Sequence, residues 1–188
     1  MTTSPAQQLS FEPVYDASVW TYVHNGDNTA RYLLGTQGQR TLVCFGINTS
    51  TAEPNKLDPT VTKVRNIALR NGYDSFMMMN VYPQRATDPN DLHGLSDPQM
   101  KADNEHHIAH FINGGTYDIV AAWGNLIDKR PYLYPNLQAI AQLPELAQCN
   151  WFHLGTLTKG GHPRHPLYLR LDVSLNSFDI TAYTQRQS

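Results

Sequence analysis

A continuous apolar run at residues 41–47 constrains the fold most strongly, because a polar loop and a helix start follow it. The run reads TLVCFGI, which is typical of a strand buried on both faces. It gives way at Asn48 to small polar residues, and Asp58-Pro59 then predicts a helix start, with aspartate as the N-cap. Ligands of open α/β sheets sit outside the carboxyl ends of the strands. The loop at residues 48–56 is therefore the first candidate for a site.

Length and composition fit one globular domain. The chain has 188 residues, of which 40% are hydrophobic and 16% charged. We expect a flexible tail over residues 1–13 and a single α/β domain over residues 14–188. The net charge of -2 predicts no strong overall attraction to nucleic acid or membrane. Cys44 and Cys149 make neither a disulfide framework nor a zinc ligand set. No segment resembles a signal peptide or a membrane span, so we expect a cytoplasmic protein without a membrane partner.

Strand-like and helix-like segments alternate along the chain. Residues 19–23 and 32–34 predict an antiparallel hairpin, with Asn25-Gly26 as its turn signal. Further buried strands are expected at 75–81, 118–123 and 150–155, and helices at 59–70, 98–112 and 133–142. Such alternation is typical of a parallel sheet covered by helices on both faces. The predicted fold is a three-layer α/β/α sandwich with a mostly parallel sheet of about four strands, plus the N-terminal hairpin.

Polar or small residues end the predicted parallel strands. The first strand ends at Gly46-Ile47-Asn48, the second at Asn80 and the third at Trp123-Gly124-Asn125. The carboxyl ends of parallel strands lie along one rim, to which a loop carrying His162 and His165 could return. Arg85, just past a strand end, is a candidate for binding an anion. No glycine-rich phosphate loop is present.

Four segments carry a resemblance to a known family. They are GINTSTA, MNVYPQRATDP, AAWG and GHPRHPLYL, in this order within residues 31–169. Together they are similar to the uncharacterised family called "domain of unknown function 1643", which has no established activity. The chain departs from the expected pattern at Thr49, where proline is expected, and at Glu53, where aspartate is expected.

The order of the strand-end motifs also resembles the uracil-DNA glycosylase superfamily, which implies that fold and the hydrolysis of an N-glycosidic bond. By this resemblance Asn48 positions the water, Asn80 reads the base, and His162 or His165 stabilises the leaving base. An asparagine can orient water but cannot take its proton, whereas a neutral histidine can donate a hydrogen bond to a departing base. The expected partner is DNA or a nucleotide or nucleobase, with no cofactor and no metal. The expected substrate-binding residues are Gly46, Ile47, Ser50, Thr51, Asn80, Arg85, Trp123, Gly124, Arg164 and Tyr168.

Several alternatives stay open at this point. Asn48 and Asn80 are also the kind of residue that caps or bridges loops, and Trp123 could belong to the core. A non-catalytic module of the same fold could bind nucleic acid or a nucleotide without turnover. A metal-dependent hydrolase could use His106 and His110, which are four residues apart on a predicted helix. The sequence does not specify the oligomeric state.

Overall fold

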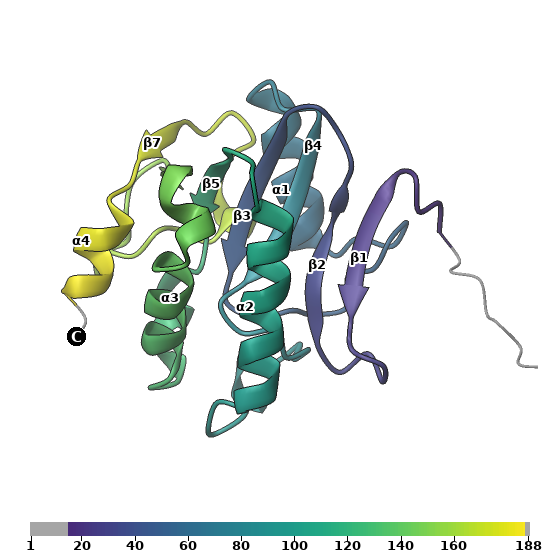
Figure 1. Ribbon diagram of the computed structural model, residues 1–188. Helices are drawn as coiled ribbons and strands as arrows, with labels where there is room; N and C mark the ends of the chain where they lie inside the picture. Colours follow the sequence, from purple (N-terminus) through teal and green to yellow (C-terminus); the bar gives the residue numbers. More distant parts are fainter. Residues whose placement is uncertain (1–14, 187–188) are drawn as a thin grey trace, which may run out of the picture.

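The structure is a computed structural model that describes residues 15–186. The tail predicted for residues 1–13 lies outside the described residues. Seven strands form one sheet in the order β1-β2-β4-β3-β5-β6-β7 (Figure 1). The strands are β1 (Trp20–His24), β2 (Arg31–Thr36), β3 (Thr41–Gly46), β4 (Ser75–Asn80), β5 (Asp118–Ala121), β6 (Asn150–Leu154) and β7 (Leu175–Ser177).

The centre of the sheet is parallel: β4, β3, β5 and β6 lie side by side and run in the same direction. All six residues of β4 are buried, and so are all but the first of β3. Consecutive residues of β3 point to opposite faces, with Cys44 packing in one core cluster and Phe45 in the other. Because both faces are covered, both faces need apolar side chains. The unbroken apolar run of β3 follows from this arrangement.

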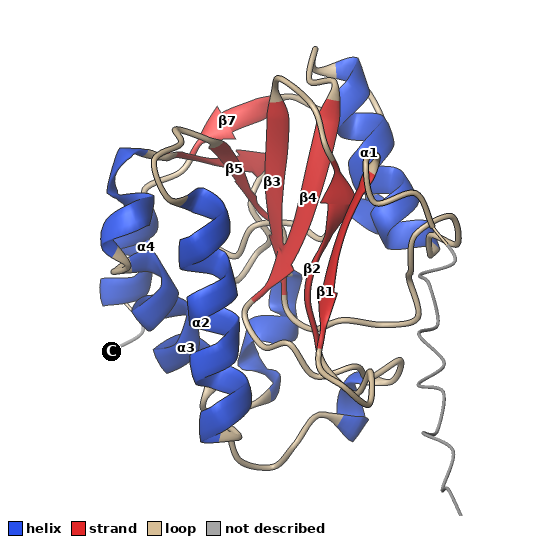
Figure 2. Cartoon of the chain, turned by 45° about the vertical axis from the view of Figure 1, so that its right-hand side comes forward, coloured by secondary structure: helices blue, strands red, loops and turns tan. Residues whose placement is uncertain are grey.

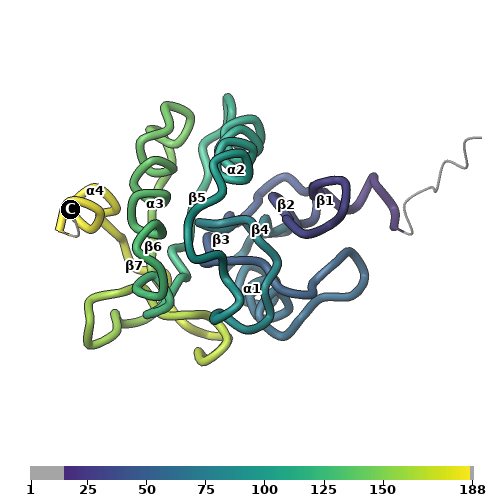
Figure 3. Tube along the Cα trace, turned by 90° about the horizontal axis from the view of Figure 1, so that it is seen from below, coloured from purple at the N-terminus to yellow at the C-terminus, as the bar shows by residue number. Residues whose placement is uncertain are grey.

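Helices lie on both faces of the sheet. Helix α1 (Pro59–Arg70) covers one face, while α2 (Pro98–Ile112), α3 (Leu133–Ala141) and α4 (Ile180–Gln185) lie on the other (Figures 2 and 3). The carboxylate of Asp58 accepts a hydrogen bond from Val61 N at 2.8 Å, and that of Asp97 accepts one from Met100 N at 2.9 Å. Both helices therefore begin at the proline that follows their aspartate cap. The mixed α/β class is confirmed.

The strands that follow β3 and β5 in the chain lie on opposite sides of this pair in the sheet: β4 beside β3, and β6 beside β5. From β3 the chain runs through α1 to β4, and from β4 it crosses through α2 to β5 on the other side of β3. The carboxyl ends of β3 and β5 are thus neighbours whose following segments cover different faces of the sheet. A sheet of this kind opens a crevice where the direction of winding reverses. The loop after β3 borders this place.

The sheet is larger than the sequence predicts. The hairpin of β1 and β2 joins the sheet, since β2 pairs antiparallel with β4. At the other edge, β7 pairs antiparallel with β6, and α4 follows it. Neither β7 nor α4 was foreseen, because three and six residues are too short to display a period. None of the described helices is both long and apolar enough to cross a membrane.

Gly35 offers a test of the β2–β4 pairing. A Cβ atom at this position would lie 2.1 Å from the carbonyl oxygen of Phe76 on β4, a backbone atom that cannot move aside cheaply. We expect Gly35→Ala to lower the free energy of unfolding by about 3 kcal/mol, the upper range for overpacking. Gly26→Ala is the control, because nothing lies within 4 Å of its Cβ position. Urea denaturation compares the two, and equal unfolding midpoints would contradict the β2–β4 packing described here.

Candidate functional site

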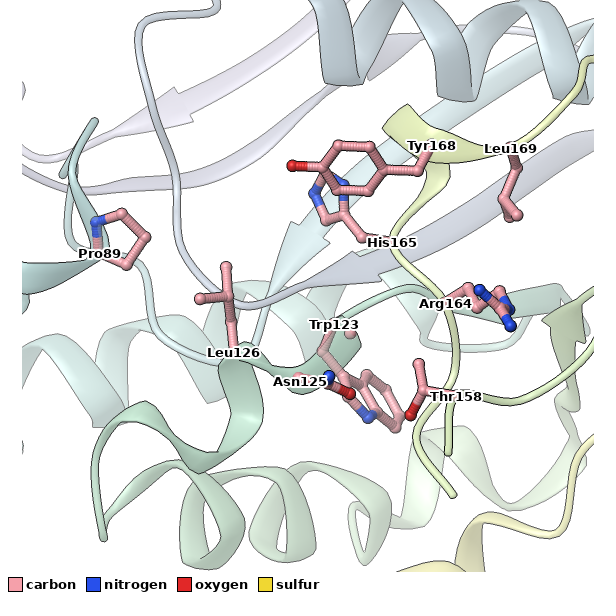
Figure 4. A pocket seen from close by; sticks show the side chains of 10 residues that line it. Pro89, Trp123, Asn125, Leu126, Thr158, Arg164, His165, Tyr168 and Leu169 are labelled. Carbon is pink, nitrogen blue, oxygen red and sulfur yellow. The ribbon is translucent and has the colours of Figure 1, made fainter. Parts of the chain in front are cut away.

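A crevice with two adjoining lobes lies at the carboxyl ends of β3 and β5. The Trp123 lobe is a cavity of about 450 Å³, and the Asn48 lobe one of about 330 Å³. Pro89, Leu126 and His165 line both cavities and so separate the lobes. Figure 4 shows the Trp123 lobe with the rings of His165 and Tyr168 close together. The Trp123 lobe is lined by Pro89, Trp123, Gly124, Asn125, Leu126, Thr158, Arg164, His165, Tyr168 and Leu169.

The Asn48 lobe gathers the polar residues of the loop after β3. Besides Pro89, Leu126 and His165, it is lined by Arg31, Gly46, Ile47, Asn48, Ser50, Thr51, Asp58, Pro59, Thr60, Val61, Met78, Ala86, Thr87 and Leu167. Six of the residues that the sequence singles out therefore border one cavity: Gly46, Ile47, Asn48, Ser50, Thr51 and His165.

The side chain of Asn48 is held in one orientation. Its Nδ2 donates to the carbonyl oxygens of Thr49 at 2.9 Å and Ala86 at 2.7 Å. Two acceptors on one side of the amide identify that side as the NH₂ group. No protein group in the described chain donates to Oδ1, so this oxygen can accept a hydrogen bond from water or a ligand.

Thr49, which stands where proline is expected, ties the loop to its neighbour. It is fully buried. Its hydroxyl donates to Pro83 O at 3.0 Å, and its amide donates to Gln84 O at 3.3 Å. A proline could make neither bond, because it has no hydroxyl and no N–H. Hydrogen bonds to the following loop thus replace the constraint that a proline ring would supply.

His165 presents one ring nitrogen to the crevice. Its Nδ1 accepts a hydrogen bond from Leu167 N at 3.4 Å and so caps the short helix η4 (Pro166–Tyr168). A neutral ring that accepts at Nδ1 carries its proton on Nε2, and Nε2 has no protein partner within residues 15–186. Burial lowers the pKa of His165, against an opposing effect of the Asp58 carboxylate. The neutral form with a proton on Nε2 is therefore favoured near pH 7.

The other candidate histidine, His162, lies outside both lobes. It is buried, with Nδ1 at 2.8 Å from the hydroxyl of Tyr183 and Nε2 at 3.2 Å from a carboxylate oxygen of Asp128. The same Tyr183 hydroxyl accepts a hydrogen bond from Trp123 Nε1 at 3.1 Å. His162 thus connects α4 to the segment after β5, while His165 lines both lobes of the crevice. The sequence left the choice between the two histidines open.

Asn80 is the last residue of β4 and lines neither lobe. It is 1% exposed, and neither atom of its side-chain amide has a hydrogen-bond partner in the described chain. A Cβ atom on Gly46 would lie 2.8 Å from Asn80 Oδ1. A side chain at position 46 would collide with Asn80, so the glycine makes room for this amide beside β3.

The two candidate arginines have different surroundings. Arg85 donates from Nε to Asn28 Oδ1 at 3.0 Å and from Nη2 to Tyr22 OH at 2.6 Å, and its Nη1 donates to Ser50 O. Every nitrogen of this guanidinium contacts the protein, so Arg85 fixes the loop after β3. Arg164 is exposed and lines the Trp123 lobe, and only its Nε is engaged, with Thr156 O at 2.9 Å.

Two charged residues of the Asn48 lobe, Arg31 and Asp58, were not singled out as site residues. Arg31 is 1% exposed and lines the lobe, with Nη1 donating to Ala52 O at 2.8 Å. Burial lowers its pKa to about 10, which leaves it charged at neutral pH. Asp58 was interpreted only as a helix cap, and it also lines the lobe. An arginine at the start of an apolar strand was the one available signal for Arg31, since arginine is almost never fully buried unless paired.

The metal-hydrolase alternative finds no support in the described residues. No group of three histidine, cysteine, aspartate or glutamate side chains in residues 15–186 could hold a metal ion. His106 and His110 stack on α2 with their ring centroids 6.3 Å apart. Cys44 and Cys149 are free thiols.

The different surroundings of the two histidines predict different costs of removal. We expect His162→Ala to lower the free energy of unfolding by about 1–3 kcal/mol, because it removes a buried ring that contacts both the Tyr183 hydroxyl and the Asp128 carboxylate. His165→Ala should lower it by less than about 1 kcal/mol, since its only hydrogen bond is long. Chemical denaturation of the two variants measures both values. Equal losses of unfolding free energy in the two variants would contradict the conclusion that His162, and not His165, has a structural role.

The lowered pKa of His165 also predicts a dependence of stability on pH. In the unfolded chain His165 titrates near its ordinary value of about 6.5, and in the folded chain it titrates below that. As the pH falls from 6.5, the unfolded state binds the proton first, so the folded state loses stability. As the pH falls from 7.5 to 5.0, we expect the free energy of unfolding to decrease less in His165→Gln than in the wild type. Urea titrations at each pH measure this free energy. Parallel curves for the two proteins would contradict this.

Comparison with known proteins identifies a family and nothing more specific. The family model described as "Protein of unknown function (DUF1643)" matches residues 31–167, a range that includes Arg31, Asn48 and His165. No curated protein matches the chain, and no solved structure does. Because the family model covers well over half of the sequence, the chain belongs to the DUF1643 family.

Proposed function

We propose that the crevice binds a nucleotide, free or within DNA, and hydrolyses its N-glycosidic bond. One observation carries the proposal: Asn48 and His165 line the same cavity, and each has a polar atom, Oδ1 and Nε2 respectively, that has no partner among residues 15–186. The reaction needs a positioned water on one side of the bond and a hydrogen-bond donor to the departing base on the other. The similarity of the strand-end motifs to those of the uracil-DNA glycosylase superfamily supports the same reaction.

The Asn48 lobe holds the groups that would handle water. Asn48 Oδ1 accepts a hydrogen bond from the water but cannot take its proton. Asp58 lines the same lobe, and only Oδ1 of its carboxylate is used in capping α1. Its Oδ2 supplies the general base that an asparagine cannot, and a positioned base contributes about 10²–10⁴-fold to rate.

The Trp123 lobe suits the base. Its walls are largely apolar, and Asn125 adds an exposed amide whose donors and acceptor can read a base edge. Tyr168 is 84% exposed beside His165 and offers a ring face for stacking. Asn80 lines neither lobe, so the proposal gives Asn125 the contact that the sequence resemblance assigned to Asn80.

His165 stands where the two lobes meet, which places it next to the bond to be broken. With the proton on Nε2, the neutral ring donates a hydrogen bond to the base as negative charge develops on it. A preorganised donor at such a position is worth about 10²–10³-fold in rate. Its capping bond to Leu167 N keeps the ring in this tautomer.

A base-release assay tests the proposal. The substrates are single- and double-stranded oligonucleotides bearing uracil, mismatches or damaged bases, together with nucleosides and nucleoside 5′-monophosphates. We expect release by the wild type and losses of about 10²-fold or more in Asn48→Ala, His165→Ala and Asp58→Asn. Asparagine is as good an N-cap as aspartate, so Asp58→Asn removes the base and keeps α1.

His153→Ala is the matched control, because this histidine is also partly buried and lines neither lobe. It should release base as fast as the wild type. Binding of a substrate by folded wild type without release of any base would refute hydrolysis and leave a binding module. Release that survives in all three crevice variants would refute the assigned roles.

A further inference from the structure

Arg31 carries a buried charge that the protein leaves without a counter-ion. The side chain is 1% exposed, and no carboxylate oxygen of residues 15–186 lies within 4.0 Å of it. Of its nitrogens, Nη1 donates to Ala52 O, while the buried Nε has no partner in the described chain. Guanidinium groups are almost never buried unless they are paired, because an uncompensated charge is costly outside water.

The charged residues around Arg31 do not neutralise its positive charge. Arg85 lies close enough to lower the pKa of Arg31 further, and Glu53 pairs with Arg85 at 3.7 Å. Asp58 is the remaining carboxylate with an influence on Arg31, but one of its oxygens is committed to the cap of α1. Two positive charges, Arg31 and Arg85, thus lie near two carboxylates. Glu53 is paired with Arg85, and one oxygen of Asp58 caps α1.

Several hydrogen-bond donors stand among the apolar side chains that line the rest of the Asn48 lobe. Helix α1 has 12 residues, and its first turn borders the lobe through Pro59, Thr60 and Val61. The amide of Thr60 has no intrahelical partner at this position, and the helix dipole favours negative charge there. Hydroxyl groups of Ser50, Thr51, Thr60 and Thr87 complete the polar lining.

We propose that Arg31 is the anion-binding residue of the Asn48 lobe, and that it binds a phosphate or carboxylate group of the ligand there. Both groups match the planar fork of a guanidinium, and charge-assisted hydrogen bonds to them are strong. An anion in the lobe supplies the counter-ion that Arg31 lacks. The helix end and the hydroxyl groups add donors for the remaining oxygens.

Joined to the proposed function, on which this extension rests, the anion site specifies the substrate class. His165 separates the lobes, so a base in the Trp123 lobe leaves its sugar toward the Asn48 lobe, where Arg31 lies. A phosphate on that sugar would reach the anion site. The preferred substrate is then a nucleoside monophosphate or a nucleotide unit of DNA, and not a nucleoside or free base.

Inorganic phosphate and acetate are the probes that test the anion site on the full chain. Calorimetric titration and thermal unfolding are measured for the wild type, Arg31→Gln and Arg65→Gln. Arg65 is an exposed residue of α1 that lines neither lobe, so its variant matches the charge change. We expect phosphate to bind the wild type and Arg65→Gln equally and to bind Arg31→Gln at least tenfold more weakly. Acetate binding that depends on Arg31 in the same way would identify a carboxylate as the natural group. If acetate does not bind, phosphate is the natural group.

A second variant decides the matter if Arg31→Gln does not fold. Thr60→Glu places a carboxylate at the lobe while its position in the first turn of α1 suits the helix dipole. It should fold and bind phosphate at least tenfold more weakly than the wild type. Failure of the wild type to bind either anion, or equal binding by Thr60→Glu, would overturn the anion site.

Base release separates this inference from the proposed function. Phosphate binding that depends on Arg31, without release of any base, would refute the hydrolase and leave the anion site. Equal rates of release from nucleosides and their 5′-monophosphates, in wild type and Arg31→Gln alike, would refute the anion site and leave the hydrolase.

Discussion

The burial of β3 between two parallel neighbours is the constraint on which the remaining structure depends. A strand covered on both faces and paired on both edges has its backbone polar groups satisfied and its side chains excluded from water. It can reach solvent only at its ends. The carboxyl end of β3 is extended by bonds from Val81 N and Tyr82 N to the carbonyls of Gly46 and Ile47. The loop that carries Asn48 therefore starts from a fixed position.

Side chains that bind backbone carbonyls hold the loops around the crevice. Arg85 and Thr49 fasten the loop after β3, and Arg130 donates to the carbonyls of Asn90 and Leu92 in the loop after β4. Such bonds satisfy carbonyl groups that the sheet does not pair. They also explain why a long polar loop can present side chains in defined orientations, as Asn48 does. A site on loops of this kind is preorganised before any ligand arrives.

Several buried polar groups of the described chain depart from the rule that such groups are paired. Arg31 Nε and both amide atoms of Asn80 are buried without partners in the described chain. Other buried polar groups form networks, as around Tyr183, where His162 and Trp123 share one hydroxyl. Asn104, Glu145 and His153 each keep one unpaired buried atom away from both lobes. Among these residues Arg31 is the one that lines the Asn48 lobe, and its unpaired Nε is the basis of the anion site proposed there. Local rules are expected to fail at functional sites.

The sequence by itself determined the mixed α/β class, the start of α1 and α2 and the polar strand ends, because these depend on local periodicity and on Asp-Pro caps. It also singled out Asn48 and His165, and these residues do line one cavity. Only the tertiary structure decided that His165 and not His162 lines the crevice, since both flank prolines in one loop. It likewise brought Arg31 and Asp58 to the lobe of Asn48. Neighbours across a sheet are set by long-range pairing and packing, for which no local pattern carries a signal.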